Sequence, residues 1–270
     1  MIYIIAGGIA AVLIALYLFL IAPGRIPRGI DKSVWTADYA HRGLHSKDKT
    51  VPENSLAAFS LAVSAGYGIE VDIQISADEK VVVFHDDTLL RVCGVDKAVK
   101  DCTYEELRTY SLHETKEFIP LLSDVLSLVA GRVPLIVEFK TSNRNMLLCE
   151  KAAELLDAYN GRYVIESFNP AIVRWFRRHR PNVVRGQLAM RLKGYGTLPL
   201  HQGLILSGML ANFAARPHFA AFRHEDSRRL SLRLFRMMGG KLVGWTVRET
   251  DDIEYCKHFF DTIIFEYFRP

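Results

Sequence analysis

The sequence contains few cysteines, and none is arranged to bind zinc or to build a disulfide framework. The four cysteines are Cys93, Cys102, Cys149 and Cys256, and no two of them form a CxxC pair. No group of histidines and cysteines has zinc-finger spacing. We therefore expect free thiols in a reducing compartment.

An excess of charge of one sign is also missing. The formal net charge is +4, and basic residues alternate with acidic ones in most places, with a denser basic run only from Arg174 to Arg185. A nucleic-acid-binding protein usually combines a basic stripe with a recognition motif, and neither is present. The sequence thus predicts no nucleic-acid partner.

Residues 1–22 lack charged side chains altogether. At about 1.5 Å per residue, a helix of this length can cross the core of a bilayer. A cleavable signal peptide would start with a basic region, which is absent. We expect an uncleaved, single-pass membrane anchor. The first charges, Arg25, Arg28, Asp31 and Lys32, are mostly positive, which predicts a cytoplasmic location for the rest of the chain.

No Gly-rich phosphate loop follows the first expected strand, which disfavours a doubly wound open sheet. Residues 23–35 contain Pro and Gly and predict a linker, so that one globular domain is expected over residues 36–270. Strand and helix patterns alternate along this domain. About eight strands remain when the returning arm of a hairpin, 81–84, is left out. The alternation predicts an α/β fold, a TIM (β/α)8 barrel, with the open sheet as the alternative.

The expected elements follow from apolar periodicity and from Gly, Pro and capping residues. Strands are expected at 39–43, 69–75, 134–140, 162–168, 183–188, 219–222, 242–247 and 262–265, and the longer helices at 56–65, 121–130, 145–159, 170–179, 227–238 and 250–259. Residues 189–216 do not fit the alternation, and we expect an insertion there, either an ordinary packed loop and helix or a segment that covers the site or lies on lipid.

The most informative stretch runs from residue 68 to residue 86. Glu70 and Asp72 alternate with aliphatic residues at the period of a strand, so both carboxylates point to one side. Their repulsion would be relieved by a hard divalent cation bound between them. The returning strand ends in His85, which can transfer protons near neutral pH. The alternative is an edge hairpin with a solvated polar face.

Other expected barrel strands also become polar at their carboxyl ends, where the functional residues of such barrels lie. These residues are His41, Arg42, Glu70, Asp72, Glu138, Lys140 and Ser167, and the hairpin brings His85 to the same rim. Because isolated buried charges are costly, their convergence indicates a site. The set suits cleavage of a phosphate ester: carboxylates for Ca²⁺ or Mg²⁺, cations for phosphate oxygens, and two histidines for proton transfer. A pure ion-pair network is the alternative.

In chain order, the motifs are His41-Arg42-Gly43, Pro52-Glu53-Asn54-Ser55, Glu70-x-Asp72, His85-Asp86, Glu138-x-Lys140, Ser167-Phe168 and Trp245-Thr246-Val247. From Tyr39 to the C-terminus this pattern resembles the glycerophosphodiester phosphodiesterase family. The resemblance implies a TIM barrel that hydrolyses glycerophosphodiesters to glycerol 3-phosphate and an alcohol. It further implies that His41 and His85 are the general acid and base, that Glu70, Asp72 and Glu138 hold a divalent metal (Ca²⁺ or Mg²⁺), and that Arg42 and Lys140 contact phosphate.

The chain departs from the family pattern at three places. Arg248 stands where an Asn is usual, Glu266 where an Asp is usual, and Asp78-Glu79 where Asp-Gly is common. The first two bear on which substrate is bound more than on the reaction. Trp245 either stacks on the glycerol or head group or is a core tryptophan. The remaining histidines are interpreted as surface or structural residues, namely His45, His113, His179, His201, His218, His224 and His258.

Two other functions remain open at this point. One is a lysophospholipase D that takes a lysolipid from the bilayer, which the anchor and the apolar residues 203–210 favour. The other is a catalytically silent barrel that binds lipid or phosphate. In each case the expected partners are a small-molecule ligand and the membrane.

Overall fold

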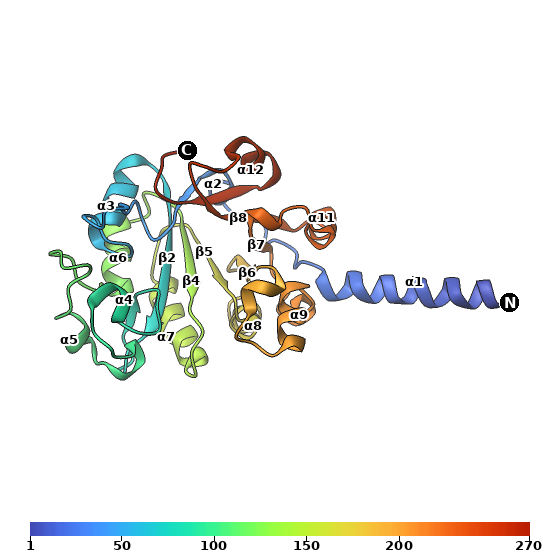
Figure 1. The fold of residues 1–270 in the computed structure, drawn as a ribbon, viewed down its shortest axis with the longest axis horizontal. Helices are drawn as coiled ribbons and strands as arrows, with labels where there is room; N and C mark the ends of the chain where they lie inside the picture. The colour runs from blue at the N-terminus through green and yellow to red at the C-terminus, as the bar shows by residue number, and fades with distance from the viewer.

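The apolar strands and the amphipathic helices between them close into a barrel. The computed structural model describes residues 1–270, and Figure 1 shows the helices around the strands. Eight parallel strands pair in a ring in which the last one returns to the first. They are β1 (Tyr39–Ala40), β2 (Gly68–Ile75), β4 (Leu135–Phe139), β5 (Tyr163–Ser167), β6 (Arg185–Ala189), β7 (Phe219–Arg223), β8 (Lys241–Val247) and β9 (Thr262–Phe265). The expected TIM barrel is confirmed, and the open doubly wound sheet is wrong.

The short connection after β2 makes a hairpin, as expected. Strand β3 (Val81–Val83) pairs antiparallel with β2, and the chain then forms a small lobe before it returns to β4. This lobe contains α4 (Leu90–Cys93) and α5 (Tyr104–Leu107) and has its own buried cluster of apolar side chains. The hairpin therefore extends the carboxyl end of β2 beyond the barrel.

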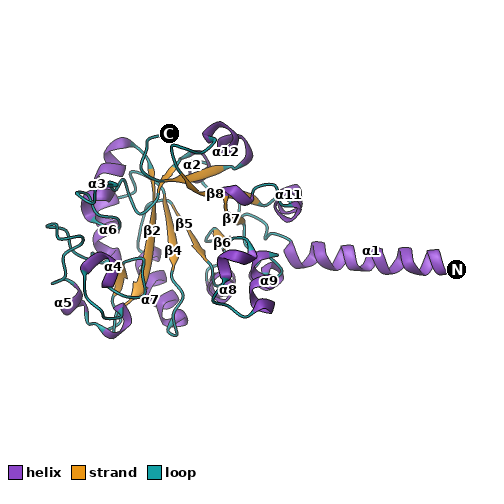
Figure 2. Cartoon of the chain, in the orientation of Figure 1, coloured by secondary structure: helices purple, strands orange, loops and turns teal.

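Helices surround the barrel, as Figure 2 shows. They are α3 (Leu56–Ala65), α6 (Leu122–Val129), α7 (Asn145–Asp157), α8 (Pro170–His179), α11 (Leu230–Met237) and α12 (Ile253–Phe259), with a short α2 (Ser33–Thr36) before β1. Their ends have local causes. The Ser55 hydroxyl accepts a hydrogen bond from the Ala58 N–H and caps α3, which stops at Gly66 in the left-handed conformation. Pro170 begins α8 behind its cap, Asn169.

The strands pack against apolar cores on both of their faces. Ile69, Val71, Ile73 and Ile75 of β2 belong to the larger core, between the barrel and its helices. A second core fills the lower barrel with residues such as Tyr39 from the strands. Side chains alternate along a strand, so Glu70 and Asp72 point into the barrel, where both are buried. The alternative of an edge hairpin with a solvated face is therefore wrong.

Helix α1 (Ile2–Ile21) projects from the barrel as an isolated rod (Figure 1). It is long and apolar enough to cross a membrane, a property that a signal sequence shares. Its last turn rests on α10 (Asn212–Ala215). The Asn212 amide donates to the Ile21 carbonyl (3.2 Å), and Arg216 donates to the carbonyls of Phe19 (2.9 Å) and Ala22 (3.1 Å). These contacts satisfy carbonyls that a helix end leaves unpaired.

Candidate active site

A cavity of about 240 Å³ lies at the carboxyl rim of the barrel. It is lined by His41, Arg42, Glu70, His85, Glu138, Lys140, Glu166, Phe168, Leu188, Trp245, Thr246, Arg248 and Ile264. Every residue predicted for the site borders this cavity except Asp72 and Ser167. The Asp72 side chain is buried beside the cavity and lies between Lys140 and Arg42. The structure thus brings together side chains from segments that are far apart in the sequence.

Three buried carboxylates form the acidic side of the cavity. Oxygens of Glu70, Asp72 and Glu138 lie within 4.8 Å of one another. Burial, together with the charges of Asp72 and Glu138, raises the pKa of Glu70 well above its ordinary range, and burial also raises the pKa of Glu138. The Glu70 Oε1 atom has no hydrogen-bond partner. An unpaired oxygen beside two further carboxylates fits a divalent cation that prefers oxygen ligands.

The predicted phosphate-binding cations contact these carboxylates. The Lys140 ammonium lies 2.8 Å from Glu138 Oε1 and 3.4 Å from Asp72 Oδ1. Arg42 Nε lies 3.2 Å from Asp72 Oδ2, and its guanidinium donates to Glu53 (2.6 Å). Burial alone would raise the pKa of Asp72, but Lys140, His85 and Arg42 hold that pKa below its ordinary range.

The ion pairs do not balance the charge of the site. Glu70, Asp72, Glu138 and Glu166 are four buried carboxyl groups, whereas the cations that border the cavity are Arg42, Lys140 and Arg248. Arg248 is already paired with a fifth carboxylate, Glu266. Arg42 is in addition engaged by Glu53. A pure ion-pair network would leave this excess unexplained, while one bound divalent cation would compensate it.

Each predicted catalytic histidine is held at Nδ1 by a carboxylate. His41 Nδ1 lies 3.0 Å from Glu266 Oε1, and His85 Nδ1 lies 2.5 Å from Asp86 Oδ1. With Nδ1 occupied, Nε2 is the nitrogen free to act on a ligand, and His41 Nε2 lies 4.0 Å from Glu70. Burial, followed by the charge of Arg42, lowers the pKa of His41 to about 4, which favours the neutral imidazole.

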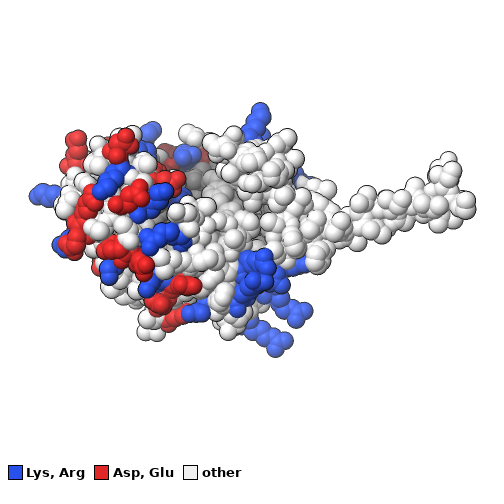
Figure 3. Space-filling view, turned by 90° about the horizontal axis from the view of Figure 1, so that it is seen from below, with Lys and Arg blue, Asp and Glu red and all other residues white.

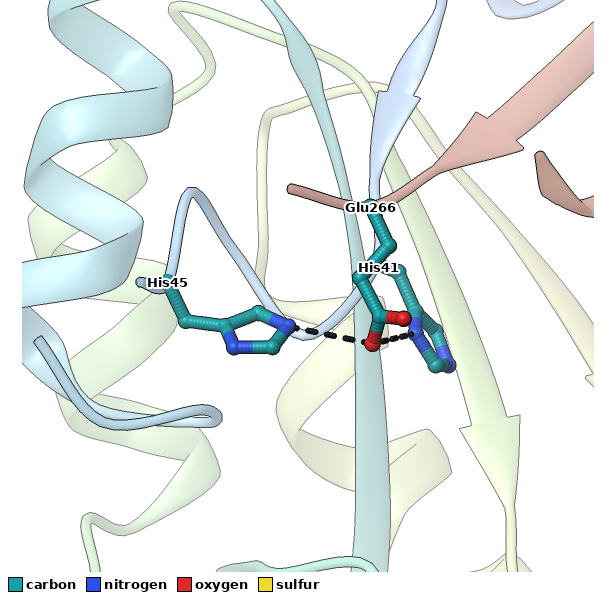
Figure 4. Close-up of side chains that lie close together, drawn as sticks. All are labelled: His41, His45 and Glu266. Atoms are coloured by element: carbon teal, nitrogen blue, oxygen red, sulfur yellow. Dashed lines mark hydrogen bonds and ion pairs between the residues drawn. The ribbon is translucent and has the colours of Figure 1, made fainter. Parts of the chain in front are cut away.

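Arg248 and Glu266, two of the departures from the family pattern, are connected to the site through the Glu266 carboxylate. Its Oε1 faces both His41 and His45, with His45 Nε2 at 3.3 Å, as Figure 4 shows. Its Oε2 accepts hydrogen bonds from the Arg248 guanidinium at 2.8 and 3.1 Å. The unusual acid and the unusual base thus pair with each other. His45 is a buried structural neighbour of this carboxylate.

Sequence reasoning missed Glu166 and placed Ser167 on the rim instead. The Ser167 hydroxyl donates to the Phe139 carbonyl within the wall of the barrel, whereas the buried Glu166 borders the cavity. Burial and the charges of Glu138 and Asp72 raise the pKa of Glu166 well above its ordinary range. The inward direction of Glu166 follows only from the register of β5 against β4, in which Glu166 lies beside Glu138.

Trp245 forms part of the cavity wall and is not fully buried. Its ring meets Phe168 edge to face, with centroids 5.7 Å apart. The indole N–H has no hydrogen-bond partner. The tryptophan therefore packs on an aromatic neighbour and also presents its ring to the cavity.

Comparisons with known proteins agree with this site. The pattern of the glycerophosphoryl diester phosphodiesterase family matches residues 41–265. A glycerophosphodiester phosphodiesterase of Bacillus altitudinis is 32% identical over 167 residues, which cover 57% of this chain and 67% of that protein. A human lysophospholipase D is 33% identical over 138 residues, covering 46% of this chain and 42% of its own.

Solved structures show the same fold. A phosphodiesterase of Oleispira antarctica, in complex with the product sn-glycerol-3-phosphate, has a TM-score of 0.71 with this chain at 19% identity. The match covers 87% of this chain and 95% of that one. With the family pattern spanning most of the barrel, these findings establish an enzyme of the phosphoric diester hydrolase class, and the chain belongs to the glycerophosphoryl diester phosphodiesterase family.

Proposed function

We propose that this enzyme hydrolyses glycerophosphodiesters to glycerol 3-phosphate and an alcohol, with His41 and His85 as its general acid and base. The observation that carries the proposal is the pair of carboxylate contacts at Nδ1 of both imidazoles, at the edge of a small, charged cavity. Two histidines oriented in the same way can take a proton at one oxygen and give one at another.

The cavity fits a divalent cation as a cofactor, held by Glu70, Asp72 and Glu138, and the hard oxygen ligands favour Ca²⁺ or Mg²⁺. When bound, such an ion supplies positive charge to phosphate oxygens as negative charge develops on them. Arg42 and Lys140 would contact the same phosphate from the cavity wall. Trp245 would pack against the glycerol or the head group.

The two histidines take complementary protonation states in this scheme. One Nε2 removes the proton from the attacking hydroxyl, and the other donates a proton to the leaving alkoxide. By resemblance to the family, the first attack comes from the substrate's own glycerol hydroxyl and gives a cyclic phosphate. Water then opens the ring with the proton transfers reversed.

Substitution of either histidine tests the catalytic roles. His41→Ala and His85→Ala should each lower kcat/KM on glycerophosphocholine by about 10²- to 10⁴-fold. His258→Ala is the matched control, because His258 is exposed on α12. Rates unchanged by both substitutions would contradict the roles. A wild-type chain that binds glycerophosphodiesters without cleaving any would favour the catalytically silent barrel.

We propose further that residues 1–22 anchor the chain as a single membrane span, that residues 23–35 are a linker, and that the barrel over 36–270 faces the cytoplasm. The support is an exposed, charge-free helix followed by Arg25 and Arg28. The chain should remain in membranes after carbonate extraction, and the barrel should resist protease added to intact spheroplasts. Release of a shortened mature chain would indicate a signal peptide instead.

A further inference from the structure

We propose that an apolar groove beside the catalytic cavity binds the acyl chain of a lysophospholipid drawn from the bilayer. The inference rests on the proposed phosphodiesterase activity and specifies a substrate class for it. The reaction is balanced by water alone: the bond between phosphorus and the head-group oxygen breaks, water supplies the hydroxyl on phosphorus, and the head-group alcohol takes up the proton. The acylated glycerol phosphate would remain in the groove until it is released.

The groove has the size and lining of an acyl-chain site. Its volume is about 540 Å³, within the range of roughly 300–1,000 Å³ typical of ligand pockets. None of its lining residues is charged. Apolar contacts come from Phe168, Met190, Tyr195, Leu198, Ile205 and Leu206. A hydrocarbon chain gains free energy there for each buried methylene, whereas a polar head group would lose its hydration without ionic partners.

Two strand ends, those of β5 and β4, connect the groove to the catalytic cavity. Phe168 borders both spaces, and its ring meets the rings of Trp245 and Tyr195 edge to face, with centroids 5.7 and 6.4 Å away. After β4, Lys140 borders the cavity and the next residue, Thr141, borders the groove. A phosphodiester in the cavity can therefore continue into the groove through the substituent on its glycerol.

The mouth of the groove lies on α9 (Leu200–Ser207), part of the stretch that interrupts the barrel pattern. Leu198 and Ile205 line the groove and are still 39% and 41% exposed. Leu200 and Leu204 are also largely exposed on the same helix. Apolar side chains gathered at one place on a surface indicate an interaction site, and here two of them, Leu198 and Ile205, border the groove.

The surroundings of α9 identify a bilayer as the source of the ligand. The segment that contains α9 continues through α10 to Arg216. Asn212 of α10 and Arg216, which follows it, hold the last turn of α1. If α1 spans the membrane, this segment lies at the bilayer surface. Residues 167–224 contain no Asp or Glu, and Figure 3 shows that acidic side chains gather at the end of the molecule away from α1. An acid-free, basic and apolar surface suits contact with anionic lipid.

A single groove has room for one acyl chain, which favours a lysolipid over a diacyl lipid. Ile205→Glu would place a charge at the mouth of the groove. Leu204→Glu is the matched control, because Leu204 is the preceding residue of the same helix, is 50% exposed and does not line the groove. Lysophosphatidylcholines of six to ten acyl carbons, kept below micelle-forming concentration, serve as monomeric probes, with glycerophosphocholine as the reference substrate.

In the full chain we expect kcat/KM to rise about two- to fourfold for each added methylene, until the groove is filled. Ile205→Glu should flatten this dependence and lower the ratio of lysolipid to glycerophosphocholine turnover at least tenfold, and Leu204→Glu should preserve both. If glycerophosphocholine is hydrolysed but kcat/KM does not rise with acyl-chain length, the groove proposal is wrong and the proposed phosphodiesterase activity still holds. An equal slope in wild type and Ile205→Glu would lead to the same conclusion.

Binding separates this proposal from the proposed function. In the His41→Ala background, calorimetric titration with decanoyl-lysophosphatidylcholine should show binding that Ile205→Glu weakens about tenfold and Leu204→Glu leaves unchanged. Such a result supports the groove even if no phosphodiester is cleaved by the wild-type chain. Absence of binding, or equal affinity in both variants, refutes the acyl-chain site whatever the catalytic activity.

Discussion

Glu266 accepts a hydrogen bond from His41 Nδ1 at 3.0 Å through one carboxylate oxygen and holds Arg248 at 2.8 Å through the other. Burial raises the pKa of this carboxyl, but His41, His45 and Arg248 hold it below its ordinary range, so it is ionised at neutral pH. The carboxylate thus fixes the tautomer of the imidazole and favours its protonated form. Glu266 is therefore a positioning residue that acts through His41.

Replacing the carboxylate by an amide should separate positioning from binding. We expect Glu266→Gln to lower kcat on the order of 10²-fold with little change in KM, because an amide supports an imidazolium poorly. Since Glu266 raises the pKa of His41, the pH limb of kcat/KM that belongs to His41 should move to lower pH. Steady-state kinetics across pH measure both effects.

The usual family residues provide the control for that experiment. The double variant Glu266→Asp with Arg248→Asn introduces the usual family residue at both positions. It keeps a carboxylate beside His41 and should keep most of the activity. Wild-type kcat and an unmoved pH profile in Glu266→Gln would show that the contact has only a structural role.

The acidic cluster should make the metal-free chain less stable as pH rises above about 4.5. The folded pKa of Glu70 lies above its ordinary value of 4.5, so the folded state binds more protons than the unfolded state between those two values. Stability is then complete below about pH 4.5 and falls as pH rises through the folded pKa. In excess chelator, Tm of the wild type should fall over this window, and Glu70→Gln should remove that part of the decrease.

Divalent ions should stabilise the wild type but not the variant Glu70→Gln. Ca²⁺ or Mg²⁺ at a hundred times its Kd should stabilise the wild type by about 2.7 kcal/mol and leave Glu70→Gln nearly unaffected. Glu154→Gln, on the exposed face of α7, is the matched control. Equal Tm with chelator and with either ion, together with undiminished hydrolysis in chelator, would rule out a metal in this cavity.

The strands and the rim residues could be predicted because each depends on local pattern. The final strand was expected at 262–265 and is found there, and alternation along β2 correctly sent Glu70 and Asp72 to the inner face. Strand ends in a parallel barrel share a rim, so the convergence of distant charged residues on one cavity also followed from the chain order.

What could not be predicted depends on register and on closure of the barrel. The strand at 162–168 is apolar at most positions, so local pattern does not tell whether Glu166 or Ser167 faces inward; the pairing with β4 decides it. Arg248 and Glu266 are 18 residues apart and meet only because β8 and β9 are neighbours. Residues 189–216 carry no strand or helix period that reveals a groove.

The hairpin turn offers a test of local strain. Glu79 has φ of +65°, a left-handed conformation in which a side chain costs about 1–2 kcal/mol relative to glycine. Its ion pairs with Arg144 (3.6 Å) and Lys151 (4.0 Å) are half-exposed and contribute little. Glu79→Gly should therefore raise the free energy of unfolding in urea by about 1 kcal/mol. Glu79→Ala, which loses the ion pairs but keeps the strain, should not; a gain of the same size in both would refute the explanation.

His218 should make the stability of the barrel depend on pH below 6.5. The ring is buried, and its Nδ1 accepts a hydrogen bond from the Arg185 N–H at 3.3 Å, which requires an unprotonated nitrogen. Burial, followed by the charge of Arg185, lowers the pKa of His218 from 6.5 to about 3. The unfolded chain therefore binds a proton below pH 6.5 that the folded chain does not. The contribution to stability is complete above pH 6.5 and decreases by about 1.4 kcal/mol per pH unit as pH falls towards 3.

A variant that keeps the acceptor but cannot be protonated isolates this contribution from that of the acidic cluster. His218→Asn should be somewhat less stable than wild type at pH 8, because it packs less well, and should lose stability more slowly on acidification. His258→Asn, at an exposed position on α12, should follow the wild type. Urea unfolding between pH 8 and pH 4 measures the slopes. Parallel slopes for His218→Asn and wild type would mean that His218 is already protonated in the folded state, in which case Nδ1 could not accept the hydrogen bond from the backbone N–H of Arg185.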